Sequence, residues 1–281
     1  SSEKSETTLS LNEFIYFTMK DAYLWYDKIP NVDYASYTDP QTLVDDLSYK
    51  TFDKWSYIVK LDKKSTSSLN VNQYEGYGFG LIWNNENDKI ILRINYVYEY
   101  SPAYRANLSR GYRIISVNDL YVAENPSDEQ KKAINDEFSK GSSLSLLIWD
   151  STNTERRVTL EKGIVTKDYI IYTKLFEKGL KKIAYMVYNE FDTYSDKDLS
   201  GDFKFFKEKN IDELIIDLRY NPGGSVSISH KIANLIAGYN NEGKIYQKMV
   251  YNDRRLQNRI NLYLKKEQNS IDLKRVIFIT S

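Results

Sequence analysis

The 281-residue chain contains no cysteine and a single histidine, His230. The lack of cysteine excludes disulfides, iron–sulfur clusters, zinc knuckles and a cysteine nucleophile. One histidine excludes a multi-histidine metal site, and a Ser-His-Asp hydrolase could use no histidine except His230. We therefore expect no metal site and no cofactor, and the chemistry must come from Ser, Lys, Asp, Glu, Tyr or the backbone.

Net charge and long apolar runs are also missing. The 39 basic residues balance the 39 acidic ones, so bulk electrostatics gives no reason to expect nucleic acid as a partner. No apolar run reaches the ~18 residues of a membrane-spanning helix, so no transmembrane span is predicted. The opening SSEKSETT is polar and has no signal-peptide core, which predicts a disordered tail over residues 1–8.

A small helical domain is predicted over residues 9–62. Ser10 opens a capping-box pattern, and the apolar residues after it recur at steps of three and four, as in an amphipathic helix. Asp39 and Pro40 start a second helix as its N-cap and first residue. Residues 63–72 are polar and rich in serine, which indicates a linker.

Residues 68–163 change to an α+β pattern that predicts a second domain. Runs such as YGFGLIW and KIILRINYV are typical of strands, and residues 127–139 predict a helix. In a glycine-rich segment that feeds an open strand, loop amides can bind a terminal carboxylate while the strand edge binds a peptide backbone. The candidate peptide-binding residues are Gly76, Tyr77, Gly78, Phe79, Gly80 and Leu81. The alternative is that these glycines only mark bulges and tight strand entries.

Residues 164–281 form a third pattern of strand, helix, strand, helix and strand. This order predicts right-handed crossovers and a largely parallel sheet. Gly238 is expected to end the second of these helices. The sequence stops at Ser281, directly after a buried strand, so we expect half of this α/β layer to be missing and the chain to be truncated.

The strongest local signal is the segment LIIDLRYNPGG, in which a buried strand runs through a turn into a helix. Gly223 and Gly224 let the backbone approach a ligand closely, and the amides at the start of the helix are unpaired. Such amides can hold an oxyanion or another anion. The alternative is an ordinary strand-to-helix connection. No GxGxxG or Walker pattern is present, so nucleotide binding is not predicted.

Two of these motifs resemble a known family in combination. GYGFGL followed by SPAYRANLSRGYRIISVND resembles a PDZ module of the bacterial permuted type, and LIIDLRYNPGG resembles the signature of the tail-specific, carboxyl-terminal processing serine peptidases. The order of the parts is also that family's, and the N-terminal helical segment is similar to exported members from Bacteroidetes. The expected fold is therefore multidomain α+β and α/β: a helical N-terminal unit, a PDZ-like domain, and a crotonase-like peptidase core that is incomplete at its C-terminus.

The resemblance implies a serine-type endopeptidase that recognises the C-terminal tail of protein substrates through its PDZ domain. Most members use a Ser-Lys dyad, in which a neutral lysine takes the proton of the attacking serine. By the family pattern both residues lie beyond Ser281, so the chain as given is expected to be inactive. The pattern also implies that Gly223 or Gly224, with a slight preference for Gly224, donates a backbone N–H to the oxyanion hole. An exported protein, periplasmic or associated with the outer membrane, is implied as well, with a lipid anchor upstream of the given N-terminus left open.

Three other features contain residue types that are common in catalytic sites, but the sequence does not favour a catalytic role for any of them. Ser281 is too early for the nucleophile by family spacing. His230 projects away from the apolar face of its predicted helix, which indicates a surface or interdomain position. Asp217 and Arg219 lie on the same side of the signature strand, which predicts a buried charge pair or a support for the turn.

Two other functions stay open. One is a non-catalytic peptide-binding scaffold made of a PDZ module and a core without a dyad. The other is a carrier of an apolar ligand, although nothing in the sequence indicates a lipid cavity. The residues that follow Ser281 would distinguish the peptidase from the scaffold.

Overall fold

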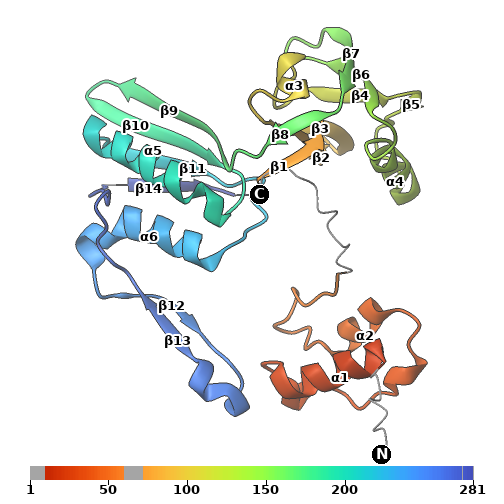
Figure 1. Cartoon of the computed structure of the whole chain (residues 1–281), viewed down its shortest axis with the longest axis vertical. Coiled ribbons are helices and arrows are strands. Elements are labelled where there is room, and N and C mark those ends of the chain that lie inside the picture. The colour runs from red at the N-terminus through yellow and green to blue at the C-terminus, as the bar shows by residue number, and fades with distance from the viewer. Residues whose placement is uncertain (1–9, 60–71, 274, 281) are drawn as a thin grey trace, which may run out of the picture. The chain divides into compact units, whose positions relative to one another are not determined.

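The computed structural model describes residues 10–59, 72–273 and 275–280 (Figure 1). The predicted tail of residues 1–8 and almost all of the linker predicted at 63–72 lie outside the described residues. Within the described ranges, no helix is both long and apolar enough to cross a membrane.

The chain divides into two compact units. The first joins the residues up to Thr66 to Gly243–Leu264, and the second contains Ser67–Glu242 and Lys265–Ser281. The segment that joins the first unit from far along the chain was not anticipated from the sequence.

Short helices form the N-terminal part of the first unit. They are α1 (Leu11–Ala22), η1 (Tyr26–Lys28), η2 (Tyr34–Ser36) and α2 (Pro40–Leu47). Ser10 Oγ accepts the Glu13 N–H at 3.2 Å, and the Asp39 carboxylate accepts the Thr42 N–H at 3.0 Å. Both predicted helix starts are therefore confirmed, because each cap satisfies amides that the helix leaves unpaired. Their apolar faces share one core, made of Ile15, Tyr16, Ile29, Leu43, Val44 and Leu47.

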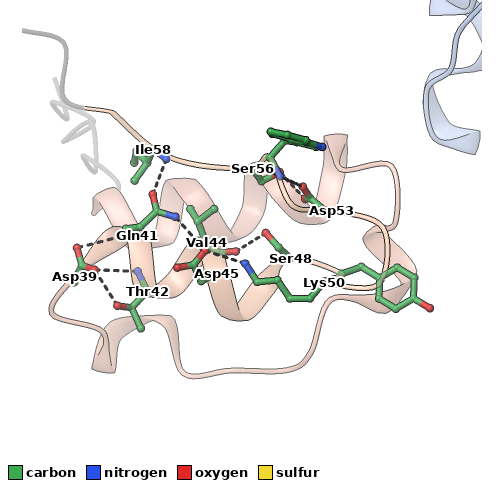
Figure 2. Close-up of polar contacts among 12 residues, drawn as sticks. Asp39, Gln41, Thr42, Val44, Asp45, Ser48, Lys50, Asp53, Ser56 and Ile58 are labelled. Carbon is green, nitrogen blue, oxygen red and sulfur yellow. Dashed lines mark hydrogen bonds and ion pairs between the residues drawn. The ribbon is translucent and has the colours of Figure 1, made fainter. Parts of the chain in front are cut away.

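Polar side chains fasten the segment after α2 back onto that helix (Figure 2). The Gln41 amide donates to Asp45 Oδ1 at 3.2 Å, and its oxygen accepts the Ile58 N–H at 2.9 Å. Asp53 accepts the Ser56 N–H at 3.0 Å and the Ser56 hydroxyl at 2.6 Å. Burial opposes ionisation of Asp53, but its hydrogen bonds prevail and lower its pKa to about 2. This carboxylate is therefore an ionised anchor of the turn at neutral pH.

The second part of the first unit is a hairpin of β12 (Ile245–Met249) and β13 (Ile260–Tyr263), with η4 (Asp253–Asn258) between the strands. Its tip reaches the C-terminal end of α1. Asn252 Nδ2 donates to the carbonyls of Asp21 and Tyr23 at 2.8 and 3.1 Å, and Arg254 Nη1 donates to the Lys20 carbonyl at 3.0 Å. The last carbonyls of a helix have no partner within the helix, so the hairpin supplies the C-terminal cap of α1.

The second unit begins with a strand pair and a six-stranded antiparallel sheet. The pair is β1 (Gln73–Gly76) and β8 (Gly163–Thr166). The sheet contains β2 (Phe79–Glu86), β3 (Lys89–Val97), β4 (Arg113–Val117), β5 (Leu120–Tyr121), β6 (Ser143–Trp149) and β7 (Glu155–Glu161). Its order is β2-β3-β4-β6-β7, with β5 paired to β4. One edge is therefore β2, the strand that follows the predicted peptide-binding loop.

Two helices accompany this sheet, α3 (Pro102–Arg105) and α4 (Asp128–Glu137). The helix predicted at 127–139 is confirmed with slightly shorter bounds. Ser127 and Gln130 form a full capping box, in which each side chain accepts the other residue's backbone N–H. The sheet and helices share an apolar core that includes Leu92, Ile94, Ile114, Ile134, Leu144, Leu146 and Ile148.

The other sheet of the second unit has the order β14-β11-β10-β9. Its strands are β9 (Ile170–Lys178), β10 (Lys181–Tyr188), β11 (Glu213–Asp217) and β14 (Arg275–Ile279). The predicted parallel arrangement of β10, β11 and β14 is confirmed, and no described strand belongs to both this sheet and the six-stranded one. β9 was not predicted; it runs antiparallel to β10 in a hairpin.

Helices connect the parallel strands. After η3 (Thr193–Ser195), α5 (Asp196–Lys209) leads into β11, and α6 (Val226–Asn241) follows it. Because β10, β11 and β14 advance in one direction across the sheet, right-handed crossovers put both helices on the same face. Buried side chains from both helices, including Leu199, Phe203, Ile228 and Leu235, accordingly belong to one core cluster with β10 and β11.

The prediction that Gly238 ends this second helix is wrong, because α6 continues to Asn241. A Cβ at Gly238 would clash with the backbone carbonyl of Lys265. The glycine is therefore a close-packing site, which lets the segment after the hairpin lie directly against α6.

Candidate functional site

The turn between β11 and α6 is held by the side chain of Asn221. Its Oδ1 accepts the Gly223 N–H at 2.7 Å, and its Nδ2 donates to the Tyr188 carbonyl at the end of β10, at 2.9 Å. The Gly223 amide is thus engaged inside the turn and is not available to a ligand.

Gly224 is placed differently from its neighbour. Phe191 N–H donates to the Gly223 carbonyl at 2.9 Å, and Ser225 N–H donates to the Phe191 carbonyl at 2.6 Å. Phe191 is therefore hydrogen-bonded to the residues on both sides of Gly224. The Gly224 N–H itself makes no hydrogen bond among the described residues, and the residue is exposed. Its φ of 134° and the closeness of the Phe191 carbonyl both require glycine. Of the two predicted residues, Gly224 is the one whose amide a ligand can reach.

Asp217 anchors the strand end that leads into this turn. Its side chain is 1% exposed, and it accepts hydrogen bonds from Tyr185 Oη at 2.6 Å and from Arg219 Nη2 at 2.7 Å. Burial disfavours the charged form, but these hydrogen bonds, led by that from Arg219, hold the pKa of Asp217 well below its usual range. The predicted charge pair is present, with the qualification that only the aspartate is buried; the Arg219 side chain is 43% exposed.

Arg110, which comes from the part of the chain that forms the six-stranded sheet, contacts the same turn. It comes from the loop between α3 and β4, and its Nη2 lies 3.5 Å from Asp217 Oδ2. Its guanidinium also lies over the Tyr220 ring, 4.8 Å from the centroid. The sequence did not reveal this contact, because 107 positions separate Arg110 from Asp217.

The predicted peptide-binding loop forms a second candidate site. The Tyr77 carbonyl accepts the Ala103 N–H at 2.9 Å, and the Gly78 carbonyl accepts the Tyr98 N–H at 2.8 Å. Because the C=O and N–H of one trans peptide point in opposite directions, the amides of Gly78 and Phe79 point away from these partners. Gly78 has a φ of 83°, and a Cβ there would clash with the Ser101 side chain. The loop therefore presents successive amides on one side.

A groove of about 310 Å³ lies along this loop. Of the predicted residues, Gly76, Tyr77, Gly78, Phe79 and Leu81 line it. Gly80 does not line it; the lack of a side chain at this position of β2 leaves space for the ring of Tyr96.

Sequence reasoning missed four other residues of the groove, namely Tyr74, Glu75, Phe138 and Lys162. Phe138, at the end of α4, packs edge-on against Phe79 with ring centroids 6.0 Å apart. Lys162 follows β7, and its Nζ lies 5.7 Å from the centroid of the Tyr77 ring. No ion pair joins this lysine to a carboxylate among the described residues. The groove thus combines an apolar wall, free amides, the positive charge of Lys162 and the negative charge of Glu75.

Of the other residues considered in the sequence, His230 does not line the groove and lies outside the turn at Gly224. His230 lies on α6 and is partly buried, and Ser281 lies outside the described residues. In the part of the chain that the structure describes, no three His, Asp or Glu side chains gather in a way that could hold a metal ion.

Comparison with known proteins identifies the class to which this arrangement belongs. Residues 10–57 match the Peptidase S41 N-terminal domain, and residues 182–279 match Peptidase family S41. Together these matches span just over half of the chain, which therefore belongs to peptidase family S41. The resemblance to carboxyl-terminal processing peptidases noted in the sequence is confirmed.

Individual relatives agree with this assignment. The chain is 26% identical over 185 residues to the carboxyl-terminal-processing protease of Picosynechococcus sp., covering 62% of this chain and 44% of that protein. It is 25% identical over 170 residues to the carboxy-terminal processing protease CtpB of Bacillus subtilis, covering 60% of this chain and 34% of that protein. The aligned regions thus span less than half the length of these relatives.

A solved structure shows the same fold. A Bacteroides fragilis protein assigned as an S41 protease superposes with a TM-score of 0.69 at 24% identity, over 99% of this chain and 73% of that one. The mixed α/β fold with a small helical N-terminal region is therefore that of an S41 peptidase.

Proposed function

We propose that this protein acts as a serine-type endopeptidase on proteins with an accessible C-terminal tail. In this proposal residues 73–162 form a PDZ-like module that holds the tail, and the turn at Gly224 belongs to the oxyanion hole of a crotonase-like core. Membership of peptidase family S41 supports the reaction class. Export to the periplasm or the outer membrane, with or without a lipid anchor, is proposed on the same resemblance.

The observation that carries the catalytic part is the free amide of Gly224. In the proposed reaction a serine attacks the peptide carbonyl, and a neutral lysine takes the serine proton. The carbonyl oxygen becomes an oxyanion, and a preorganised N–H that needs no rearrangement stabilises it as the charge develops. Neither member of this dyad is assigned to a described residue.

The observation that carries the binding part is the groove beside β2. The amides of Gly78 and Phe79 would bind the terminal carboxylate, and the peptide would add a strand to the open edge of β2. Phe79, Leu81 and Phe138 would contact the last side chain of the substrate. Burial of one such side chain contributes only about 1.5–3 kcal/mol, so the expected affinity is weak, micromolar at best.

The test compares two forms of one unstructured substrate, with a free C-terminal carboxylate or with a C-terminal amide. The protein expressed from the complete gene should cut the free-acid form at least tenfold faster. Its rate should rise with pH as the lysine base loses its proton. Equal rates for both forms would contradict tail recognition. Binding of the free acid without any cleavage would instead support a second candidate, a non-catalytic scaffold that binds peptides in the same groove.

A further inference from the structure

A cavity of about 270 Å³ is lined by residues that neighbour the peptide-binding loop and the turn at Gly224 in the sequence. Four of the eight residues that line it are tyrosines, namely Tyr74, Tyr96, Tyr98 and Tyr220. We call this cavity the tyrosine pocket. Tyr74 precedes the peptide-binding loop by two residues, and Tyr220 belongs to the turn, so the pocket borders both candidate sites.

The walls of the tyrosine pocket are fixed by packing. A Cβ at Gly76 would clash with the Tyr74 ring, and a Cβ at Gly80 would clash with the Tyr96 ring. These glycines therefore let two aromatic rings lie directly against the backbone. Tyr98 is only 4% exposed, and its ring centroid is 4.8 Å from that of Tyr96.

The turn supplies the opposite wall. Pro222, two residues before Gly224, lines the tyrosine pocket together with Tyr220. The guanidinium of Arg110 lies over the Tyr220 ring and restricts its position. Because these walls belong to the turn itself, a side chain held here would come from a residue close to the bond that reacts at Gly224.

The chemistry of the pocket selects among side chains. Lys167 and Glu190 both line it, so a side chain of either charge would be attracted by one and repelled by the other. Burial raises the pKa of Tyr74 to about 12 and raises that of Tyr98 further, so these phenols stay neutral at physiological pH. Neutral aromatic rings pack favourably against another ring in offset or edge-to-face geometry. The volume is below that of drug-sized ligand sites and suits one large side chain.

We propose that the tyrosine pocket is a substrate subsite that selects an aromatic side chain within a few residues of the scissile bond. The role as a substrate subsite rests on the proposed peptidase function. The preference of the cavity for an aromatic group can be measured without cleavage.

The experiment uses the protein from the complete gene and unstructured peptides that share one C-terminal tail. Each peptide carries Phe, Leu or Ala at one of three positions on either side of the cleaved bond. At one of these positions Phe should raise kcat/KM at least tenfold over Leu. Tyr96→Leu should reduce this ratio below threefold, whereas Tyr96→Phe, which keeps the ring, should preserve it. Equal cleavage of Phe and Leu peptides by the wild type, or an unchanged ratio in Tyr96→Leu, would overturn the inference.

A binding measurement separates this inference from the proposed function. N-acetyl-phenylalaninamide and N-acetyl-leucinamide are compared by ligand-observed NMR, with thermal melts to verify that each variant is folded. The wild type should broaden the lines of the phenylalanine amide selectively, and Tyr96→Leu should abolish the difference. This outcome without any peptide cleavage would reject the peptidase function and keep the aromatic site. Equal broadening by both amides would reject the site, whatever the cleavage result.

Discussion

The loop at Gly78 and the turn at Gly224 both expose backbone amides, but they are built against different neighbours. A side chain at Gly224 would meet the carbonyl of Phe191, which is backbone. A side chain at Gly78 would meet the side chain of Ser101. A side chain can be shortened or can rotate, whereas a backbone carbonyl can move only with the segment that carries it. The proposed catalytic turn should therefore tolerate change far less than the proposed binding loop.

The largest expected effect is a difference in kcat between substitutions at the two glycines of the turn. Gly224→Ala keeps the backbone N–H, but the added Cβ meets the Phe191 carbonyl and forces the turn to move. Displacing the amide from the oxyanion hole should lower kcat of the protein from the complete gene by 100-fold or more, since one oxyanion donor is worth about 2.7–4 kcal/mol. Gly223→Ala is the matched control, because its φ is also positive but no atom lies within 4 Å of the added Cβ. It should cost roughly 1–2 kcal/mol of stability, the strain of a positive φ at a residue with a Cβ, and leave kcat unchanged. Steady-state kinetics and thermal melts check both, and equal kcat values would remove Gly224 from the oxyanion hole.

Because the added methyl group must move Phe191, the Gly224→Ala variant needs a control that separates a displaced amide from a wider loss of structure. Peptide affinity at the groove beside β2 provides this control. It should stay within twofold of wild type when the change is confined to the turn, and a parallel loss of affinity would indicate wider unfolding.

The next effect concerns the anchor of the turn. Arg219→Met removes the bidentate partner of the buried Asp217, which keeps its hydrogen bond from Tyr185. Because Arg219 is 43% exposed, the free energy of unfolding should fall by only about 1.5 kcal/mol at neutral pH. The pKa of Asp217 is depressed in the folded protein, so the stability from this contact is present above the unfolded pKa. It is lost as the pH falls through the lower, folded pKa. Urea unfolding of both proteins from pH 7 to pH 2 should show a difference that shrinks below about pH 4. A constant difference would contradict the electrostatic origin.

A smaller effect is expected in the binding loop, and it should be partly reversible. Gly78→Ala should weaken free-acid peptide binding about tenfold, which is about 1.4 kcal/mol. Adding Ser101→Gly removes the clashing side chain and should restore part of that affinity, although the positive φ stays strained. Calorimetric titration measures both variants. Failure of Ser101→Gly to restore any affinity would show that the loop is as rigid as the turn.

The smallest effect tests the positive charge in the groove. Lys162→Met should weaken binding of a free-acid peptide by two- to fivefold, in line with about 0.2–1 kcal/mol for a solvent-accessible charge pair. Binding of the matching amidated peptide should not change. An equal loss for both peptides would mean that Lys162 contributes through packing and not through its charge.

The parts of the molecule that the sequence predicted are those with local causes. The helix starts at Ser10, Asp39 and Ser127 follow from side chains that cap amides two or three positions away. The parallel order of β10, β11 and β14 follows from the alternation of strands and helices. The turn and the loop were also found, because glycine at a strained or crowded position leaves a visible mark in the sequence.

The features that the sequence did not predict depend on residues far away in the chain. In the sequence, Gly238 cannot be distinguished from a glycine that ends a helix. Only the close approach of the Lys265 carbonyl shows that its role is in packing. Phe138 and Lys162 reach the groove from the ends of α4 and β7. Local sequence patterns carry no information about such long-range contacts. They also could not show that Asn221 accepts the Gly223 N–H and leaves the Gly224 N–H unpaired.

The cap that Asn252 and Arg254 place on α1 has a consequence for how the protein is made. Chain synthesis is sequential, and N-terminal segments generally begin to fold while later ones are still being added. Here the carbonyls of Lys20, Asp21 and Tyr23 receive their partners from residues about 230 positions later. Most of the chain must leave the ribosome before that end of the helix can be covered. The contacts of α1 are therefore completed only by a hairpin that is synthesised about 230 residues later.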